Sequence, residues 1–307
     1  MWKLVLLLIF TLIVVPILAF SFDDPLTLEQ KAALMQIVSI YLIAALACFL
    51  ISTISKNYSQ VDKLWSLIPI VYVWVVCWNS GFESRMVLMS VLVTIWGLRL
   101  TYNFSRRGGY SLKFWEGEED YRWAVVRSKP EFQAPWKWVA FNFFFISFYQ
   151  MGLILLFTLP IVKSMDGSPL SWVDYLLAGI FILFVVLETI ADQQQWTFQN
   201  EKYKQLKNGE KLSGMYEEGF LQKGLWGIVR HPNYSAELAI WIVFYLFSVA
   251  ATGNWINWSI AGSLLLILLF FGSSNLSESI SSGKYPDYKN YQKRVPRFVP
   301  SIFKSNK

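Results

Sequence analysis

The sequence of 307 residues has little charge, one histidine and two cysteines. Charged residues make up 16% of the chain, against about 25% in an average soluble protein. This deficit excludes a disordered, collagen-like or ordinary cytosolic chain. The single histidine, His231, argues against a His-rich metal centre. Cys48 and Cys77 both fall in apolar runs, so we expect neither a disulfide framework nor a cysteine metal site.

The scarce charges leave long apolar runs that predict membrane-spanning helices. A run of about 18 or more uncharged apolar residues is typical of a bilayer span. The predicted fold is all-α, a polytopic transmembrane bundle of seven to eight spans with cytoplasmic amphipathic loops. A transmembrane barrel is excluded because no run alternates strictly between apolar and polar residues. The predicted spans are residues 2–20, 33–54, 64–82, 86–104, 138–162, 170–191, 234–252 and 256–274.

The placement of basic residues predicts the orientation. With the N-terminus inside, the inner segments hold 23 of the 27 Lys and Arg residues, and the outer loops hold Lys31, Arg85 and Lys163. This asymmetry follows the positive-inside rule, so we expect both termini in the cytoplasm if the first span is retained. It also explains the net charge of +6 without nucleic acid as a partner. The first run also resembles a signal peptide, whose removal would leave seven spans, but its length and poor cleavage site favour an uncleaved helix.

Two acidic residues lie at the inner end of the sixth predicted span. Glu188 and Asp192 are four residues apart, and Gln195 and Gln199 continue the same helical face. An acidic side chain near the bilayer interior is costly and usually marks function. From Asp192 onward, a helix that simply emerges into water is an equal alternative. Glu188 is harder to explain in that way, because uncharged residues precede it continuously from Tyr175.

The most informative segment is Gly-Leu-Trp-Gly-Ile-Val-Arg-His-Pro-Asn-Tyr-Ser-Ala-Glu, which ends at Glu237. Pro232 suits the first turn of the seventh span, where its missing N–H is no loss. Arg230 and His231 then lie at a helix N-terminus, whose free amides and dipole favour an anion. With Asn233 and Glu237 on one face below, the pattern suits a phosphorylated cofactor. An interfacial cap with a snorkelling Arg230 is the simpler alternative, and it leaves Glu237 unexplained.

Other polar residues near span ends allow two interpretations. In the fourth predicted span, Arg99 either snorkels to the interface or belongs to a site with Tyr102, which lies about one turn further on. Asp62 precedes the third predicted span. In the tail, aromatic residues recurring among basic residues flank a nucleotide or anchor the chain among lipid head groups, and the spacing favours anchoring. These residues are Tyr285, Tyr288 and Tyr291.

Several motifs occur in order along the chain: Asp62…Trp65, Trp96-Gly-x-Arg-Leu, Asn103…Arg106-Arg107, Glu118-x-Asp-Tyr-Arg-Trp123, Asp192-Gln…Phe198, and Gly224-Leu-Trp…Arg-His-Pro-Asn-Tyr…Glu237, followed by the Tyr-rich tail. Together they resemble the bacterial branch of the steroid 5-alpha-reductase superfamily, the DUF1295 membrane proteins. The resemblance covers approximately residues 60–300, and it implies a location in a bacterial inner membrane.

This resemblance implies a helical membrane reductase that uses NADPH to saturate a carbon–carbon double bond conjugated to a carbonyl. It implies a sterol-like or other lipid substrate from the bilayer, N-terminal spans over 1–57 and a catalytic domain over 58–307. Steroid reductases polarise the carbonyl with a Gln-Glu pair and a tyrosine. The pair is absent here, and the catalytic candidates are Asp62, Arg99 and Tyr102. Implied cofactor contacts, with no metal, are Glu188, Asp192, Arg230, His231, Asn233, Tyr234, Glu237, Glu278, Tyr288 and Tyr291.

Alternative functions remain at this point. The Arg-His-Pro-x-Tyr motif and the C-terminal segment also resemble isoprenylcysteine and phospholipid methyltransferases, which bind S-adenosylmethionine. The Trp-Gly-x-Arg-Leu and Asp-x-x-Trp elements favour reduction over methylation. The absence of Gly-x-Gly-x-x-Gly excludes a Rossmann nucleotide site, and the absence of an internal repeat argues against a transporter. A structural or assembly protein would tolerate alanine at Glu237 and Asn233.

Overall fold

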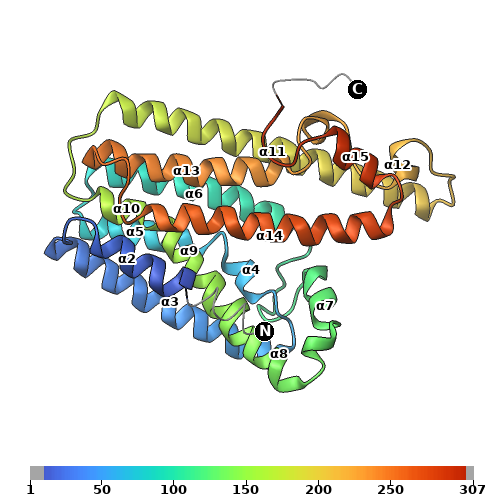
Figure 1. The fold of residues 1–307 in the computed structure, drawn as a ribbon, viewed down its shortest axis with the longest axis horizontal. Helices are drawn as coiled ribbons and strands as arrows, with labels where there is room; N and C mark the ends of the chain where they lie inside the picture. The colour runs from blue at the N-terminus through green and yellow to red at the C-terminus, as the bar shows by residue number, and fades with distance from the viewer. Residues whose placement is uncertain (1–9, 302–307) are drawn as a thin grey trace. The chain divides into compact units, whose positions relative to one another are not determined.

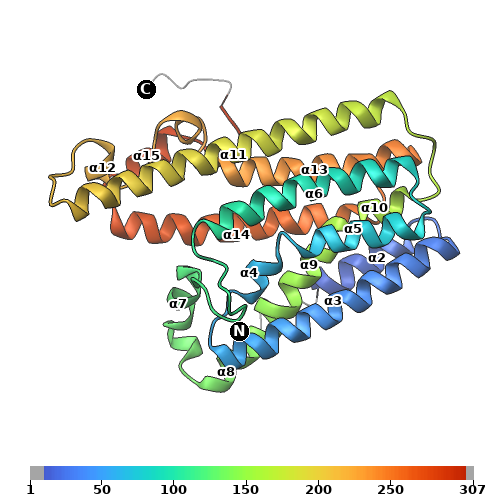
Figure 2. The same ribbon diagram turned by 180° about the vertical axis from the view of Figure 1, so that it is seen from behind.

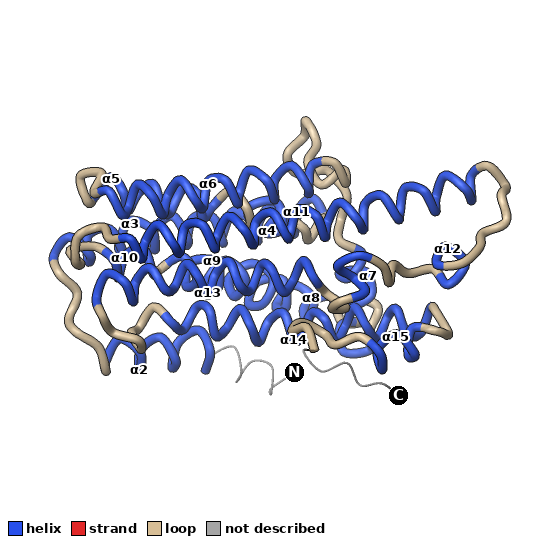
Figure 3. The backbone as a smooth tube through the Cα atoms, turned by 90° about the horizontal axis from the view of Figure 1, so that it is seen from above, coloured by secondary structure: helices blue, strands red, loops and turns tan. Residues whose placement is uncertain are grey.

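The computed structural model describes residues 10–301. Within this range every regular element is a helix, as Figure 3 shows and as the sequence predicts. In chain order the elements are η1 (Phe10–Val14), α2 (Val15–Ser21), α3 (Leu28–Ser55), α4 (Gln60–Leu64), α5 (Ile68–Asn79), α6 (Ser84–Ser105), α7 (Tyr121–Arg127), η2 (Pro130–Phe132), α8 (Pro135–Phe141), η3 (Asn142–Tyr149), α9 (Gln150–Thr158), α10 (Pro160–Ser164), α11 (Trp172–Lys207), α12 (Met215–Glu218), η4 (Gly224–Gly227), α13 (Pro232–Thr252), α14 (Ile260–Lys284) and α15 (Tyr288–Arg294).

Six helical stretches of the described residues are long and apolar enough to cross a membrane, which fits an integral membrane protein. The span predicted over 64–82 contains only α5, a helix of 12 residues, shorter than the about 20 that a span needs. The span predicted over 2–20 lies partly outside the described residues, and η1 and α2 form its described part. The six stretches are Leu28–Ser55, Ser84–Ser105, Pro135–Ser164, Trp172–Lys207, Pro232–Thr252 and Ile260–Lys284.

The chain divides into two compact units, and the first comprises the described part of 1–178 together with 243–265. Its core is built around Pro135–Ser164, because 89% of the apolar window of this stretch is buried. α3 and α5 pack against it, and α5 and α6 run side by side, as Figure 2 shows. Gly97 permits this approach, since a Cβ atom there would lie 2.5 Å from the Ser66 carbonyl oxygen.

Two buried ion pairs stabilise the first unit. Arg85 of α6 donates through Nε to Asp174 Oδ1 at 2.7 Å, and neither side chain is exposed. Its other nitrogen atoms donate to the second Asp174 oxygen and to two backbone carbonyls. Lys163 Nζ lies 2.9 Å from Asp23 Oδ1 in the same way. Arg85 and Lys163, which the sequence assigns to outer loops, are thus each enclosed with a carboxylate from a distant segment.

The second unit comprises 179–242 and the described part of 266–307. Its longest element is α11, whose 36 residues continue without a break past residue 191, where the predicted span ends. At 1.5 Å per residue this helix is about 54 Å long, well beyond the about 30 Å of a hydrocarbon layer. α11 lies beside α13 and runs in the opposite direction, as Figure 1 and Figure 2 both show.

A C-terminal strap, residues 285–301, is held against the start of α13 in the second unit. The backbone N–H groups of Arg230 and His231 donate to the carbonyls of Pro296 and Arg297 at 2.8 and 3.1 Å. The first turn of an α-helix has no acceptors of its own for its N–H groups, and the strap supplies acceptors just ahead of that turn. The strap therefore covers the helix N-terminus that the sequence predicts as an anion site.

The tail tyrosines Tyr288 and Tyr291 are buried within the protein. Their exposed fractions are 6% and 1%, and their ring centroids lie 5.1 and 5.3 Å from that of Phe220. Burial raises the pKa of Tyr288 to about 12. The Tyr291 hydroxyl donates to the Trp226 carbonyl. The interpretation of these two tyrosines as head-group anchors is therefore wrong, because they contact protein side chains instead.

Candidate functional site

The Gly-Leu-Trp-Gly turn η4 fixes the chain that enters α13 directly onto α11. Gly224 has φ +63°, and a Cβ atom there would lie 2.5 Å from Gln194 Nε2. The Leu225 N–H donates to Gln194 Oε1 at 3.0 Å, and Trp226 Nε1 donates to the Ala191 carbonyl at 3.0 Å. The motif singled out in the sequence thus aligns the start of α13 with the middle of α11.

Glu278, near the end of α14, accepts hydrogen bonds from four side chains. Arg230 Nε and Nη2 lie 2.8 and 3.2 Å from its two carboxylate oxygens. His231 Nε2 lies 2.8 Å away, Gln292 Nε2 lies 2.7 Å away, and Arg297 Nη2 lies 3.4 Å away. Only 4% of the Glu278 side chain is exposed. A buried carboxylate paired this completely joins α13, α14 and the strap into one framework.

Arg230 uses all three of its guanidinium nitrogen atoms within the protein. Besides its bonds to Glu278, its Nη1 donates to the Gln292 carbonyl at 3.0 Å and to the Val295 carbonyl. Arg230 therefore holds the strap, whereas the sequence predicts a contact with cofactor phosphates. Arg297 is the more accessible cation of this cluster, since 27% of its side chain is exposed.

Four of the predicted cofactor residues meet on what we call the polar face: Glu188 and Asp192 of α11, and Asn233 and Glu237 of α13. Asn233 Nδ2 donates to Asp192 Oδ1 at 3.3 Å. Glu188 precedes Asp192 by about one turn and Glu237 follows Asn233 by one turn, so the antiparallel helices place them at a similar level (Figure 1). Each of the three carboxylates is 4% exposed, and Trp241 Nε1 donates to Glu237 Oε1 at 3.1 Å.

Two buried oxygen atoms of this region have no hydrogen-bond partner among the described residues. They are Asn233 Oδ1 and Gln195 Oε1, and Gln195 follows Asp192 by three residues on the same side of α11. Buried polar atoms are normally hydrogen-bonded, and each exception requires an explanation. Acceptors of this kind suit a ligand that offers hydroxyl or amide donors.

Tyr234 and His231 form a stacked pair at the first turn of α13. Their ring centroids lie 5.3 Å apart, and the Tyr234 ring also meets Phe270 of α14 edge-on at 4.7 Å. Tyr234 and His231, both predicted to contact the cofactor, thus lie against α14, the helix that carries Glu278. In the part of the chain that the structure describes, no group of three or more His, Cys, Asp and Glu side chains is placed to hold a metal ion.

The three predicted catalytic residues all lie in the first unit. Asp62 of α4 accepts a hydrogen bond from Trp123 Nε1 at 3.3 Å, and burial together with the Asp120 carboxylate raises the pKa of Asp62. Arg99 is half-buried on α6. Tyr102 is 68% exposed on α6, with the Arg106 guanidinium 5.8 Å from its ring centroid.

Sequence reasoning missed three side chains that build this arrangement. Gln194 fixes η4, and Gln292 and Arg297 complete the shell of Glu278. Gln194 follows Asp192 by two residues, so its position on a site helix was a usable signal. Gln292 and Arg297 gave none, because their partner precedes them by 14 and 19 residues across a chain reversal.

Comparison with known proteins identifies the family. Residues 48–295 match the family described as "Protein of unknown function (DUF1295)". The chain belongs to the DUF1295 family. An uncharacterized protein of Schizosaccharomyces pombe is 35% identical over 274 residues, which cover 82% of this chain and 75% of that protein. No solved structure matches the chain. The matched region contains every predicted site residue from Asp62 to Tyr291, and the family expected from the motifs is confirmed.

Proposed function

We propose that this DUF1295 protein is a membrane reductase that uses NADPH to saturate a carbon–carbon double bond conjugated to a carbonyl in a sterol-like or other lipid. The observation that carries the proposal is the polar face, where buried carboxylates of α11 and α13 gather with buried acceptors that have no hydrogen-bond partner among the described residues. Ionisable groups at such depth are typical of function. We place both termini in the cytoplasm, following the distribution of basic residues.

The chemistry of the second unit fits this cofactor. The free oxygens of Asn233 and Gln195 suit the hydroxyl and carboxamide donors of the nucleotide, and the carboxylates of the polar face suit its ribose hydroxyls. Arg297 is the more exposed cation of the Glu278 cluster and is the proposed contact for a phosphate. NADPH, when bound, supplies the hydride. Arg230 and Glu278 act as positioning residues, because they hold the strap and the start of α13 in place.

On the substrate side, Asp62 is the proposed hydrogen-bond donor. Reduction of an enone develops negative charge on the carbonyl oxygen, and a donor placed there lowers the barrier. Burial raises the pKa of Asp62, which favours the protonated carboxyl that can donate such a hydrogen bond. We assign this role to Asp62 ahead of Arg99 and Tyr102, because Tyr102 is exposed.

One observation favours a second candidate function. The polar face carries the carboxylates of Glu188, Asp192 and Glu237, and three acids suit a cofactor with positive charge. S-adenosylmethionine carries such charge on its sulfonium and ammonium groups. A membrane methyltransferase of the isoprenylcysteine or phospholipid type is therefore the alternative.

Calorimetry on the detergent-purified full chain with NADPH, NADH and S-adenosylmethionine separates these functions. We expect NADPH to bind, and Glu237→Ala to weaken its binding about ten-fold or more, as loss of a hydrogen bond to a charged group predicts. Glu217→Gln, at an exposed position of α12, serves as the matched control and should leave binding unchanged. Binding of S-adenosylmethionine alone would overturn the reductase, and unchanged affinity in Glu237→Ala would remove Glu237 from the site.

A further inference from the structure

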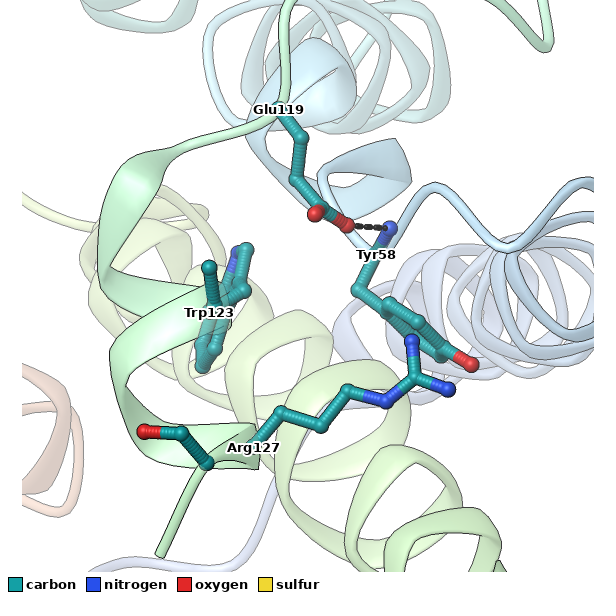
Figure 4. A pocket seen from close by; sticks show the side chains of 6 residues that line it. Tyr58, Glu119, Trp123 and Arg127 are labelled. Carbon is teal, nitrogen blue, oxygen red and sulfur yellow. Dashed lines mark hydrogen bonds between the residues drawn. The ribbon is translucent and has the colours of Figure 1, made fainter.

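A second candidate site lies in the first unit, which does not contain the polar face. It is a pocket of about 320 Å³ between α7 and the chain that follows α3, shown in Figure 4. This volume is at the lower end of the range for small-molecule sites, about 300–1,000 Å³. The lining residues are Tyr58, Glu119, Trp123, Ala124, Arg127 and Ser128.

Arg127 supplies a cation whose hydrogen-bond donors are unused. Its guanidinium carbon lies 5.6 Å from the Tyr58 ring centroid and 5.7 Å from that of Trp138, so cation–π contacts hold it in place. Within residues 10–301 it forms no hydrogen bond or ion pair. A guanidinium held this way presents planar donors that match a phosphate.

Glu119 supplies the opposite charge to the same pocket. Its Oε1 accepts the Tyr58 N–H at 2.6 Å, the dashed line in Figure 4, which fixes the carboxylate on the far side of the pocket from Arg127. The rings of Trp123 and Tyr58 line the space between the two charges (Figure 4). The pocket is thus dipolar, with an aromatic middle.

The ends of two candidate membrane spans flank this pocket. Tyr58 follows Ser55, the last residue of the α3 span, by three residues, and Trp138 belongs to the span that begins at Pro135. The neighbouring Trp136 is 63% exposed, and exposed tryptophan at a span end is typical of the membrane–water interface. The pocket therefore lies at the level of lipid head groups.

We propose that this pocket binds the head group of an amino phospholipid, with the phosphate against Arg127 and the ammonium against Glu119. The charge complementarity carries the choice of ligand. A purely anionic head group would satisfy Arg127 but bring its negative charge toward Glu119. An amine alone would leave the Arg127 donors unused. The site is independent of the proposed cofactor site, since all of its residues belong to the first unit.

The test measures lipid binding to the full chain in detergent by native mass spectrometry. The probes are phosphatidylethanolamine and phosphatidylglycerol with identical acyl chains, together with water-soluble phosphoethanolamine. The variants are Arg127→Gln and Glu119→Gln, with Lys129→Gln as the control, because Lys129 is an exposed cation outside the pocket. Glu119→Gln keeps the acceptor for the Tyr58 N–H, so it removes charge without removing that hydrogen bond.

We expect wild-type protein to prefer phosphatidylethanolamine. Arg127→Gln should weaken the binding of both lipids about ten-fold, and Glu119→Gln should weaken only the binding of phosphatidylethanolamine to that extent. Lys129→Gln should change neither. Equal retention of both lipids by wild type and Glu119→Gln would overturn the proposal, even if Arg127→Gln failed to fold. Phosphoethanolamine binding as tightly as the lipid would overturn the assignment to a membrane lipid.

Discussion

The Arg85 ion pair of the first unit and the polar face of the second unit bury polar groups in contrasting ways. In the first unit, the Arg85 guanidinium finds all of its partners within the chain, in Asp174 and two carbonyls. On the polar face of the second unit, Asn233 Oδ1 and Gln195 Oε1 have no partner among the described residues. A buried polar atom without a partner costs about 1–3 kcal/mol. Burial of charge alone therefore does not identify a site, and the polar face differs from the Arg85 pair because it combines buried carboxylates with unused buried acceptors.

The Glu278 cluster resembles the Arg85 ion pair, because the charged groups of both find their partners within the protein. Resemblance to steroid reductases implies that Glu278 contacts the cofactor, but its carboxylate already accepts from four side chains. Its contribution to binding is then indirect, through the position of the strap. This comparison separates residues that stabilise the fold from residues that are free to bind a ligand. Substitutions of the first kind should lower stability, and substitutions of the second kind should weaken binding.

The largest effect is expected at Arg85. Replacing it with alanine leaves the Asp174 carboxylate buried without its cation, which should lower the free energy of unfolding by about 3–5 kcal/mol. Thermal unfolding in detergent measures this loss, with Lys31→Ala at an exposed position of α3 as the control. The double variant Arg85→Met, Asp174→Leu should recover most of the stability. Equal stability of Arg85→Ala and Lys31→Ala would show that the ion pair is not part of the framework.

The next effect separates Glu278 from Glu237. Glu278→Ala leaves its buried partners Arg230 and His231 without their carboxylate acceptor, and should destabilise the protein by about 3 kcal/mol. Hydrogen exchange should then accelerate in the strap, residues 285–301. Glu237→Gln, in contrast, should leave exchange in the strap unchanged and weaken only cofactor binding. If hydrogen exchange in the strap stayed slow in Glu278→Ala, Glu278 would not hold the strap, and its cluster would belong with the proposed binding residues.

The helices themselves could be predicted because their cause is local. Apolar runs of span length predicted α3, α6 and α13 to within several residues, and Pro232 marked the start of α13, whereas α14 continues past the predicted end at residue 274 to Lys284. The failure at 64–82 has a physical reason. That run is apolar throughout but is interrupted between α4 and α5, and hydropathy does not record a backbone break.

The sequence predicts which residues belong to the candidate site, but it does not predict how distant residues pair within it. Periodicity placed Glu188 with Asp192, and Asn233 with Glu237, on shared helical faces. The pairing of Arg230 with Glu278 spans 48 residues, and nothing in local spacing distinguishes it from a free anion-binding arginine. Burial of Tyr288 and Tyr291 likewise depends on Phe220 from a distant turn.

The smallest effect concerns Asp62, a carboxyl of the first unit that, like those of the polar face, is largely removed from solvent. Burial and the Asp120 carboxylate raise the pKa of Asp62 above its ordinary value of 3.8. The native state then holds this proton more tightly than the unfolded chain does. The contribution of Asp62 to stability is therefore greatest at low pH, and it declines as the pH rises from about 4 through the raised pKa of the folded state.

Asp62→Asn should remove this decline, because an amide does not ionise. The unfolding temperature of the variant should exceed that of wild type by on the order of 2 °C at about pH 8, and the difference should shrink toward about pH 4. Asp24→Asn, at an exposed position, controls for loss of a carboxylate as such and should show no such trend. A difference that grew on acidification would mean that Asp62 is stabilised as a carboxylate, and it would remove the proposed hydrogen-bond donor from the substrate side.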